Sequence, residues 1–389
     1  MGSEMTAIDP GSPPRPDHTT DVRAPDRPPL SVARRLSVEP RPCPASPATV
    51  TVVIPCYNYG RFLPAAVGSA ISQTSVTVDV VIVDDASTDD SLAVARRLEA
   101  IQPGLTVLAH QRNCGPVDTF NDGLAAATGE FLVRLDADDL LTPGSLARAV
   151  AVMRAFPSVG LVYGHPIHFS GDARPGARTV PSRWTIFPGK EWLRDRCRSG
   201  LNVITSPEVL MRKSVVDVTG GQRPLRHTHD MEMWLRMAAF CDVAYIHGAD
   251  QAWHREHADS LSAKHVDALR DLVERREAFD VLFSGPVGSM RGAGELHAMA
   301  MEALATDAVE LASREFDHFR ADPGLVDRLQ EIASTMASDV QALRGWPGLQ
   351  RRMAMGAPWA SFYPPFFLHR LVRGLGGVHR RRRWHRNGV

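Results

Sequence analysis

Residues 50–58 read VTVVIPCYN, a β-branched run that ends at Pro55. β-branched residues favour strands, and a short continuous apolar run is typical of a strand buried on both faces. The same kind of run recurs downstream, with strands expected over 78–83, 105–109, 131–135, 159–163 and 207–211. Helical apolar spacing separates these runs and predicts helices over 62–73, 91–101, 116–127, 143–156, 190–198 and 229–240. Such alternation with short connections predicts an α/β fold in which a mostly parallel sheet is flanked by helices.

Polar side chains follow the ends of three of these predicted strands. They are Tyr57 and Asn58 after the first strand, Asp84 and Asp85 after the second, and Asp136, Asp138 and Asp139 after the fourth. Ligands of parallel sheets bind beyond the carboxyl ends of the strands. The sequence therefore predicts one binding site built from segments that are far apart along the chain.

The segment 136–139 reads DADD and places three carboxylates in four residues. Unpaired, these carboxylates would repel one another, and a bound cation would remove the repulsion. Hard oxygen ligands suit Mn²⁺ or Mg²⁺, and either ion can also bridge a diphosphate. The alternative is an acidic, solvated turn or a helix cap before Thr142 and Pro143. The position directly after a buried strand favours the metal site.

Together these segments resemble glycosyltransferase family 2, whose members have the Rossmann-like GT-A fold. The resemblance rests on VIPCYNY at 53–59, DDAS at 84–87, TGEF at 128–131 and DADD at 136–139. They occur in the family's order and lie within a region of similarity covering roughly residues 50–262. The resemblance implies an inverting transfer of a sugar from a nucleotide diphosphate donor, most commonly a UDP-sugar, to an acceptor hydroxyl.

The resemblance also implies roles for the polar residues. Pro55, Tyr57 and Asn58 would border the nucleobase in the nucleotide-facing turn, and Asp84 and Asp85 would form the base-binding segment, with Asp85 bonding the imide. Asp136 would contact the ribose, Asp138 would ligate Mn²⁺ or Mg²⁺ at the diphosphate, and Asp139 would help to orient the sugar. For residues 87–89 a helix cap remains the better interpretation.

Two further residues complete the implied site. Asp230 stands where the family has its general base, although His229 replaces the usual Glu before it. Asp230 could instead cap the helix, and the two roles are compatible at a helix N-terminus. His257 lies in a segment that resembles the family's closing motif and would complete the metal shell or touch the diphosphate. The alternative for His257 is a surface histidine in a charged turn.

The chain divides into four regions by composition. Residues 1–48 are rich in Pro, Arg and Ser and are expected to form a disordered leader. Residues 49–262 form the predicted GT-A domain, in which 164–183 is expected to be a loop. Residues 263–345 are expected to form a helical appendage, with helices over 266–283, 295–319 and 325–343. Residues 346–389 form an aromatic and basic tail, which could lie on a membrane surface or pack on the appendage.

Composition narrows the partners. The formal net charge of +0 gives no overall field that would attract nucleic acid. The five scattered cysteines and the lack of an apolar run of roughly 20 residues favour a cytoplasmic protein, and a peripheral position on the inner face of the cell membrane stays open. The acceptor is expected to be a glycan, a lipid-linked molecule or a small molecule.

Other functions remain open. The motif Gln-x-x-Arg-Trp of processive members is absent from the expected place, which favours a single addition. A sugar-nucleotide pyrophosphorylase would be expected to begin with a Gly-rich phosphate loop and an activating Lys. A non-catalytic sugar-nucleotide binding or scaffold protein is the alternative from a different class. A Rossmann dehydrogenase is excluded because the first turn has no G-x-G-x-x-G.

Overall fold

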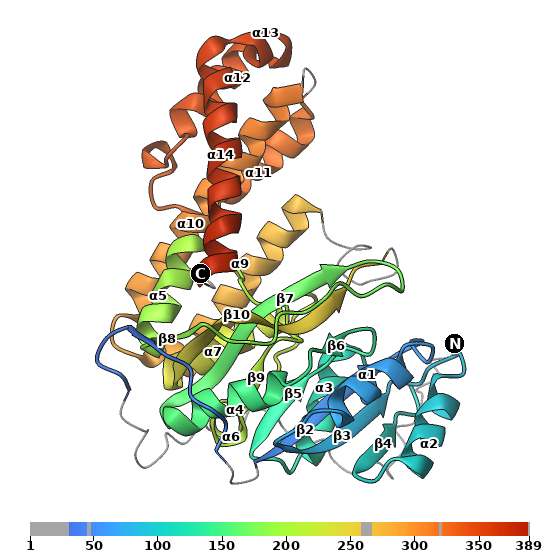
Figure 1. The fold of residues 1–389 in the computed structure, drawn as a ribbon. Coiled ribbons are helices and arrows are strands. Elements are labelled where there is room, and N and C mark those ends of the chain that lie inside the picture. The colour runs from blue at the N-terminus through green and yellow to red at the C-terminus, as the bar shows by residue number, and fades with distance from the viewer. Residues whose placement is uncertain (1–30, 45–47, 258–266, 319–320, 388–389) are drawn as a thin grey trace, which may run out of the picture.

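The computed structural model describes residues 31–44, 48–257, 267–318 and 321–387, and within them one sheet forms the centre of the molecule (Figure 1). Its strands are β1 (Leu36–Val38), β2 (Thr49–Cys56), β3 (Thr77–Asp84), β4 (Leu105–Ala109), β5 (Phe131–Arg134), β6 (Leu140–Leu141), β7 (Val159–Phe169), β8 (Arg183–Phe187), β9 (Leu210–Arg212) and β10 (Asp242–Arg255). They are ordered β1-β8-β10-β7-β9-β5-β2-β3-β4, and β6 pairs with β10. The predicted α/β class, with a central sheet flanked by helices, is confirmed.

Seven helices accompany the sheet within these described ranges. They are α1 (Leu63–Ile71), α2 (Ser91–Ile101), α3 (Pro116–Ala126), α4 (Ser145–Ala155), α5 (Gly189–Ser199), α6 (Lys213–Thr219) and α7 (His229–Phe240). The bounds of α2 and α7 are those that the apolar spacing predicts. Glycine allows α3 to pack closely on the sheet, because a Cβ at Gly123 would lie 2.4 Å from Cγ1 of Val53.

The parallel half of the sheet positions the binding edge. β5, β2, β3 and β4 are parallel neighbours, and Cys56 is in register with Asp84, which is in register with Ala109. The carboxyl ends of these strands therefore lie level with one another. The segments that follow β2, β3 and β5 lie at this edge, as the sequence predicts.

The other half of the sheet is more mixed than predicted. β9 is antiparallel to both β5 and β7, and β8 is antiparallel to β10. The predicted loop over 164–183 is wrong at both ends, because β7 continues to Phe169 and β8 begins at Arg183. β10 is missing from the prediction because buried polar residues such as Asp250 interrupt its apolar pattern. The partner of Asp250 is Arg178, 72 residues away, whose Nε lies 3.1 Å from Oδ2.

The predicted disordered leader over 1–48 is corrected in its second half. Residues 36–38 form β1, which pairs antiparallel with β8. Ser31 and Val32 also donate hydrogen bonds of 2.6 and 2.8 Å to the carboxylate of Asp242 at the start of β10. A three-residue edge strand held by backbone pairing needs no apolar run, so composition does not reveal it. Residues 1–30 lie outside the described part of the chain.

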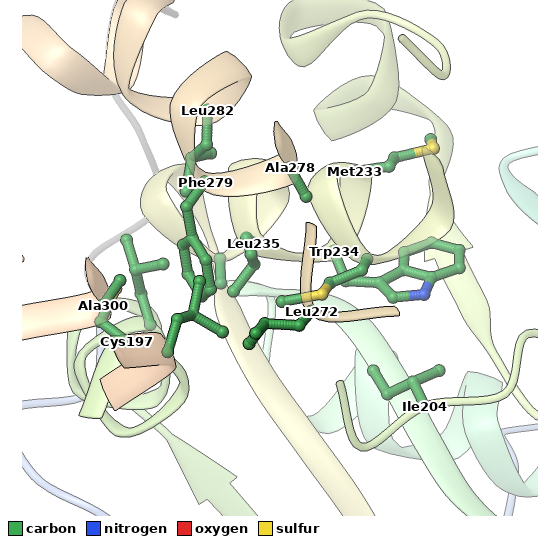
Figure 2. Close-up of a cluster of buried hydrophobic side chains, with 14 of the residues drawn as sticks. Cys197, Ile204, Met233, Trp234, Leu235, Leu272, Ala278, Phe279, Leu282 and Ala300 are labelled. Atoms are coloured by element: carbon green, nitrogen blue, oxygen red, sulfur yellow. The ribbon is translucent and has the colours of Figure 1, made fainter. Parts of the chain in front are cut away.

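The C-terminal region is helical, as predicted. It contains α9 (Ala268–Ser284), α10 (Ala293–Glu315), α11 (Pro323–Met336), α12 (Trp346–Met355), α13 (Ala357–Phe362) and α14 (Pro364–Asn387), with short 3₁₀ turns at Pro286–Ser289, Phe316–His318 and Val340–Ala342. Figure 2 shows how it joins the sheet domain: Leu235 of α7 lies beside Phe279 of α9, with Cys197 of α5 and Ala300 of α10 close by. The appendage and the sheet domain therefore share one buried apolar cluster.

The tail is part of this helical region. Phe366 is buried, and the guanidinium of Arg352 lies 3.8 Å from its ring centre. Trp359 and Phe362, in contrast, are exposed. α14 runs back along the appendage and ends beside the sheet domain (Figure 1). There Nε1 of Trp384 donates a 2.8 Å hydrogen bond to the carbonyl of Val203. In the part of the chain that the structure describes, no helix combines the length and the apolar character needed to cross a bilayer.

Candidate active site

The turn after β2 presents one aromatic side chain and anchors one amide. Tyr57 is 42% exposed at the end of the strand. Asn58 adopts a positive φ of 59°, which Asn tolerates better than most residues. Its Oδ1 accepts a 2.7 Å hydrogen bond from the backbone of Thr88, and its own N–H donates to Ser87. Asn58 therefore ties the turn after β2 to the turn after β3, while the ring of Tyr57 can face a ligand.

Asp84 and Asp85 follow β3 and are both buried. Oδ2 of Asp84 accepts from the backbone of Ser87 at 3.1 Å, whereas its buried Oδ1 has no hydrogen-bond partner. Asp85 accepts from the backbones of Cys114 and Gly115 at 2.7 and 2.9 Å. Asp85 thus shapes the loop that leads into α3, and its carboxylate retains little free acceptor capacity.

Asp85 also belongs to a group of potential metal ligands. Its Oδ1 lies 2.8 Å from Nδ1 of His110. Ligand atoms of Asp85, His110 and Cys114 all lie within 4.8 Å of one another, and no other three-residue group of this kind occurs among the described residues. The sequence did not single out His110 or Cys114. The acidic segment that was predicted to bind metal does not, by itself, bring three side-chain ligands together.

Asp136 forms an ion pair that the sequence did not indicate. Its Oδ1 accepts a 3.0 Å hydrogen bond from Nε of Arg134, and Nη1 of Arg134 donates to Gln222. Burial by itself would raise the pKa of Asp136, but the guanidinium of Arg134 outweighs it and holds the pKa below the usual value. Asp136 is therefore an oriented carboxylate at the end of β5.

Asp138 lies against His257, which is 119 residues further along the chain. Oδ2 of Asp138 and Nε2 of His257 are 2.8 Å apart. Burial, followed by repulsion from Asp139 and Asp136, raises the pKa of Asp138 to about 6. Negative charge is thus crowded at this point, and a carboxylate and an imidazole face each other as two ligands of one cation would.

Asp139 fixes the end of β10, two residues before His257. Its Oδ1 accepts from the backbone of Arg255 at 2.8 Å, and its Oδ2 lies 3.1 Å from Nδ1 of His254. Burial would lower the pKa of His254, but the attraction of the Asp139 carboxylate outweighs it and raises the pKa to about 9. The end of β10 is therefore held to the acidic segment by a charged pair, and His257 is held beside Asp138.

Asp230 lies in the first turn of α7, as predicted. Its Oδ1 accepts from the backbone of Met231 at 2.6 Å, and its Oδ2 accepts from the hydroxyl of Ser206 at 3.0 Å. Burial raises the pKa of Asp230, and the nearby charge of Arg134 partly opposes this rise. Arg134 also pairs with Asp136, so one guanidinium lowers the pKa of the predicted donor carboxylate and opposes the rise in the pKa of the predicted base.

Two neighbours of Asp230 are unusual. Ser206 has a φ of 116°, which is strained for any residue other than glycine, and such strain is concentrated at functional sites. His229 is buried, and burial together with repulsion by Arg134 lowers its pKa to about 3. A neutral imidazole therefore stands where the sequence comparison expects a Glu. Strain of this kind leaves no signal in the sequence beyond the Pro207 that follows.

Comparisons with known proteins point to one family of enzymes. Residues 51–219 match the model of "Glycosyl transferase family 2". An uncharacterized glycosyltransferase of Nostoc sp. is 41% identical over 114 residues, which cover 29% of this chain and 35% of that protein. The succinoglycan biosynthesis protein ExoO of Rhizobium meliloti is 38% identical over 101 residues, covering 26% of this chain and 28% of that protein. The alignments thus span about a third of the length of these relatives.

A solved structure covers more of the chain. TarS residues 1–349 of S. aureus, in complex with UDP-GlcNAc, align with 79% of this chain and 92% of that one, with a TM-score of 0.54 and 16% sequence identity. The alignment extends beyond residues 51–219, because 79% of this chain exceeds the length of that segment. This likeness shows a shared fold and confirms the predicted GT-A architecture.

Proposed function

We propose that this chain, whose residues 51–219 match the model of glycosyltransferase family 2, acts as a member of that family and transfers a sugar from a nucleotide diphosphate donor, in the simplest case a UDP-sugar, to an acceptor hydroxyl with inversion. One observation carries the proposal. The carboxylate of Asp138 lies 2.8 Å from His257 at the strand edge, and Arg134, which pairs with Asp136 at that edge, also acts electrostatically on the buried carboxylate of Asp230. We infer that the cation site and the base serve one reaction centre.

Asp138 and His257 are the residues that would hold Mn²⁺ or Mg²⁺. Two protein ligands suffice for such ions when substrate phosphates supply the others. The bound ion would stabilise the negative charge that grows on the leaving diphosphate. The repulsion that raises the pKa of Asp138 supports this fit, because a cation would remove it.

Asp230 is the proposed general base. It would take the proton from the acceptor hydroxyl as the oxygen attacks the anomeric carbon. Burial raises its pKa, which makes the carboxylate a stronger base, and the hydroxyl of Ser206 would keep that carboxylate oriented. A single displacement assisted by one base inverts the anomeric centre, so no covalent intermediate with the enzyme is needed.

The remaining predicted residues would bind the donor in two ways. Pro55, Tyr57 and Asp84 would border the nucleobase, and Asp136 would contact the ribose. Asp85 would bond the imide only through the small acceptor capacity that Cys114 and Gly115 leave to its carboxylate. The hydrogen bonds of Asn58 and Asp139 support positioning roles instead, because both side chains hold neighbouring backbone. We retain single addition as part of the proposal. A glycan acceptor agrees with the name of the succinoglycan relative.

The experiment that tests the proposal is a thermal-shift screen of nucleotide sugars with and without Mn²⁺. We expect one donor to raise the melting temperature only when the ion is present, and to be hydrolysed slowly to the free nucleotide. No shift with any nucleotide sugar, in either condition, would contradict the proposed function.

A further inference from the structure

A cavity of about 900 Å³ lies beside the proposed catalytic residues, between α5, the segment after it and the end of α14. Apolar and cationic side chains share its wall. The lining residues that matter here are Arg196, Arg198, Val203, Thr205, Arg383 and Trp384. The C-terminal end of α14 contributes Arg383 and Trp384 to the wall, and Nε1 of Trp384 donates a hydrogen bond to the carbonyl of Val203. The helical appendage therefore supplies part of this wall.

Arg196 is a buried cation that forms no ion pair within the part of the chain that the structure describes. It is only 5% exposed, and its Nε has no hydrogen-bond partner. Among the described residues its guanidinium has one direct partner, the ring of Trp192, whose centre lies 5.5 Å away. Burial, together with repulsion by Arg383, lowers the pKa of Arg196, although Tyr163 and Asp195 oppose this shift. An isolated buried charge is costly unless it is paired, so a ligand anion is the natural partner.

The one acidic residue of the cavity wall is already engaged. Asp195 accepts a 2.8 Å hydrogen bond from Arg198 and a 2.9 Å hydrogen bond from Arg35, which approaches from the N-terminal segment. Arg196 and Arg383 therefore keep a net positive charge in the cavity. Trp384 and Val203 add an apolar surface next to it.

The cavity is close to the proposed chemistry. Thr205 forms part of its wall, and the next residue, Ser206, donates to Asp230. His168, also on the wall, lies 5.1 Å from the ring of His254, which in turn pairs with Asp139. The cavity wall is therefore linked to the proposed base through Ser206 and to the acidic segment through His254.

We infer that this cavity is the acceptor site, and that it takes an acceptor with an anionic group, a phosphate or a carboxylate, bound by Arg196 and Arg383. The inference rests on the proposed function and adds the chemical class of the acceptor. The aromatic and aliphatic wall accommodates the uncharged part of that molecule.

The test is ligand-observed NMR on the full chain, in buffer without phosphate or sulfate, with matched charged and neutral probes. The pairs are glycerol 3-phosphate against glycerol, and glucuronic acid against glucose. We expect at least one charged probe to bind about tenfold or more tightly than its neutral partner. We expect Arg383→Gln and Arg196→Gln each to remove about tenfold of that affinity, as the loss of a charge-assisted hydrogen bond does.

Two control variants locate the bound anion. Arg382→Gln, the neighbouring position on α14, should bind as the wild type does. Asp138→Ala should also keep the binding, because the anion does not lie at the donor's metal. Arg383 is exposed, so its replacement tests the inference even if Arg196→Gln fails to fold.

The outcomes separate the two claims. Preference for glycerol 3-phosphate identifies a phosphate, and preference for glucuronic acid identifies a carboxylate. Equal binding of charged and neutral probes, unchanged binding in Arg383→Gln, or loss of binding in Asp138→Ala overturns the inference. Failure of the proposed function shows separately, as the absence of Mn²⁺-dependent donor binding in the wild type.

Discussion

Ser206 donates a 3.0 Å hydrogen bond from its hydroxyl to Oδ2 of Asp230, and it does so from a backbone held at a φ of 116°. If this bond orients the base, Ser206→Ala should lower turnover by roughly tenfold, which is the worth of one hydrogen bond to a charged group. The KM for the donor should not change. Steady-state kinetics check this prediction. A variant with wild-type turnover would show that Asp230 does not depend on Ser206.

Replacement of Asp138 tests the cation site. In Asp138→Ala we expect the Mn²⁺-dependent part of the donor affinity to disappear, because His257 alone cannot hold the ion. Isothermal titration of the donor, with and without Mn²⁺, measures it. Asp217→Ala, an exposed carboxylate on α6, is the matched control and should bind as the wild type does. Equal affinity of Asp138→Ala in both conditions, at the wild-type level, would remove the role of Asp138.

Much of the donor edge could be predicted because its strands are continuous apolar runs. The runs before Asp84 and Asp136 are buried on both faces, so their ends and the polar residues after them are visible in the sequence. β10 could not be predicted in this way, because the polar residues His247, Asp250 and Gln251 are buried within it and interrupt its apolar pattern. The hydrogen-bond partners of these residues are distant in the sequence. Thr185 bonds His247, and Arg148 bonds Gln251, which is 103 residues away.

The site shows the same division. Sequence motifs identify Asp138, His257 and Asp230 as candidate site residues. In the structure Oδ2 of Asp138 lies 2.8 Å from Nε2 of His257, and the roles of all three residues stay predictions. Arg134 and Ser206 carry no motif. They matter because long-range folding places the hydroxyl of Ser206 on Asp230 and brings the charge of Arg134 near enough to influence its pKa, and only the structure shows this.

Glu208 predicts how stability depends on pH. Burial raises its pKa from 4.5 to about 7, and its Oε2 has no hydrogen-bond partner. The folded state therefore holds this proton more tightly than the unfolded state. The stability that this proton contributes is fully present below pH 4.5 and is lost as the pH rises through 7. The free energy of unfolding should fall by on the order of 3 kcal/mol over that range.

Glu208→Gln should abolish this loss, so the variant should gain stability relative to the wild type between pH 5 and pH 8. Urea denaturation at the two pH values measures the difference. Glu302→Gln, an exposed position on α10, serves as the control and should follow the wild type. An identical pH dependence in Glu208→Gln and the wild type would contradict the assignment.

The exposed apolar residues of α14 predict contact with membranes. Phe367, Leu371 and Leu375 are exposed on a helix that also carries arginines, a combination suited to an anionic lipid surface. The full chain should sediment with vesicles that contain phosphatidylserine. The double variant Leu371→Ser and Leu375→Ser should not, whereas Ile101→Ser, an equally exposed position on α2, should. Equal sedimentation of all three proteins would favour a role for α14 within the helical appendage.

Asp230→Asn is the most direct test of the central claim, which is that one buried carboxylate activates the acceptor opposite a cation-bound donor. The measurement is turnover of the variant at a donor concentration that titration shows to be saturating. The account predicts donor binding like that of the wild type and turnover lower by about a hundredfold or more. Wild-type turnover in a variant that binds donor normally would contradict it.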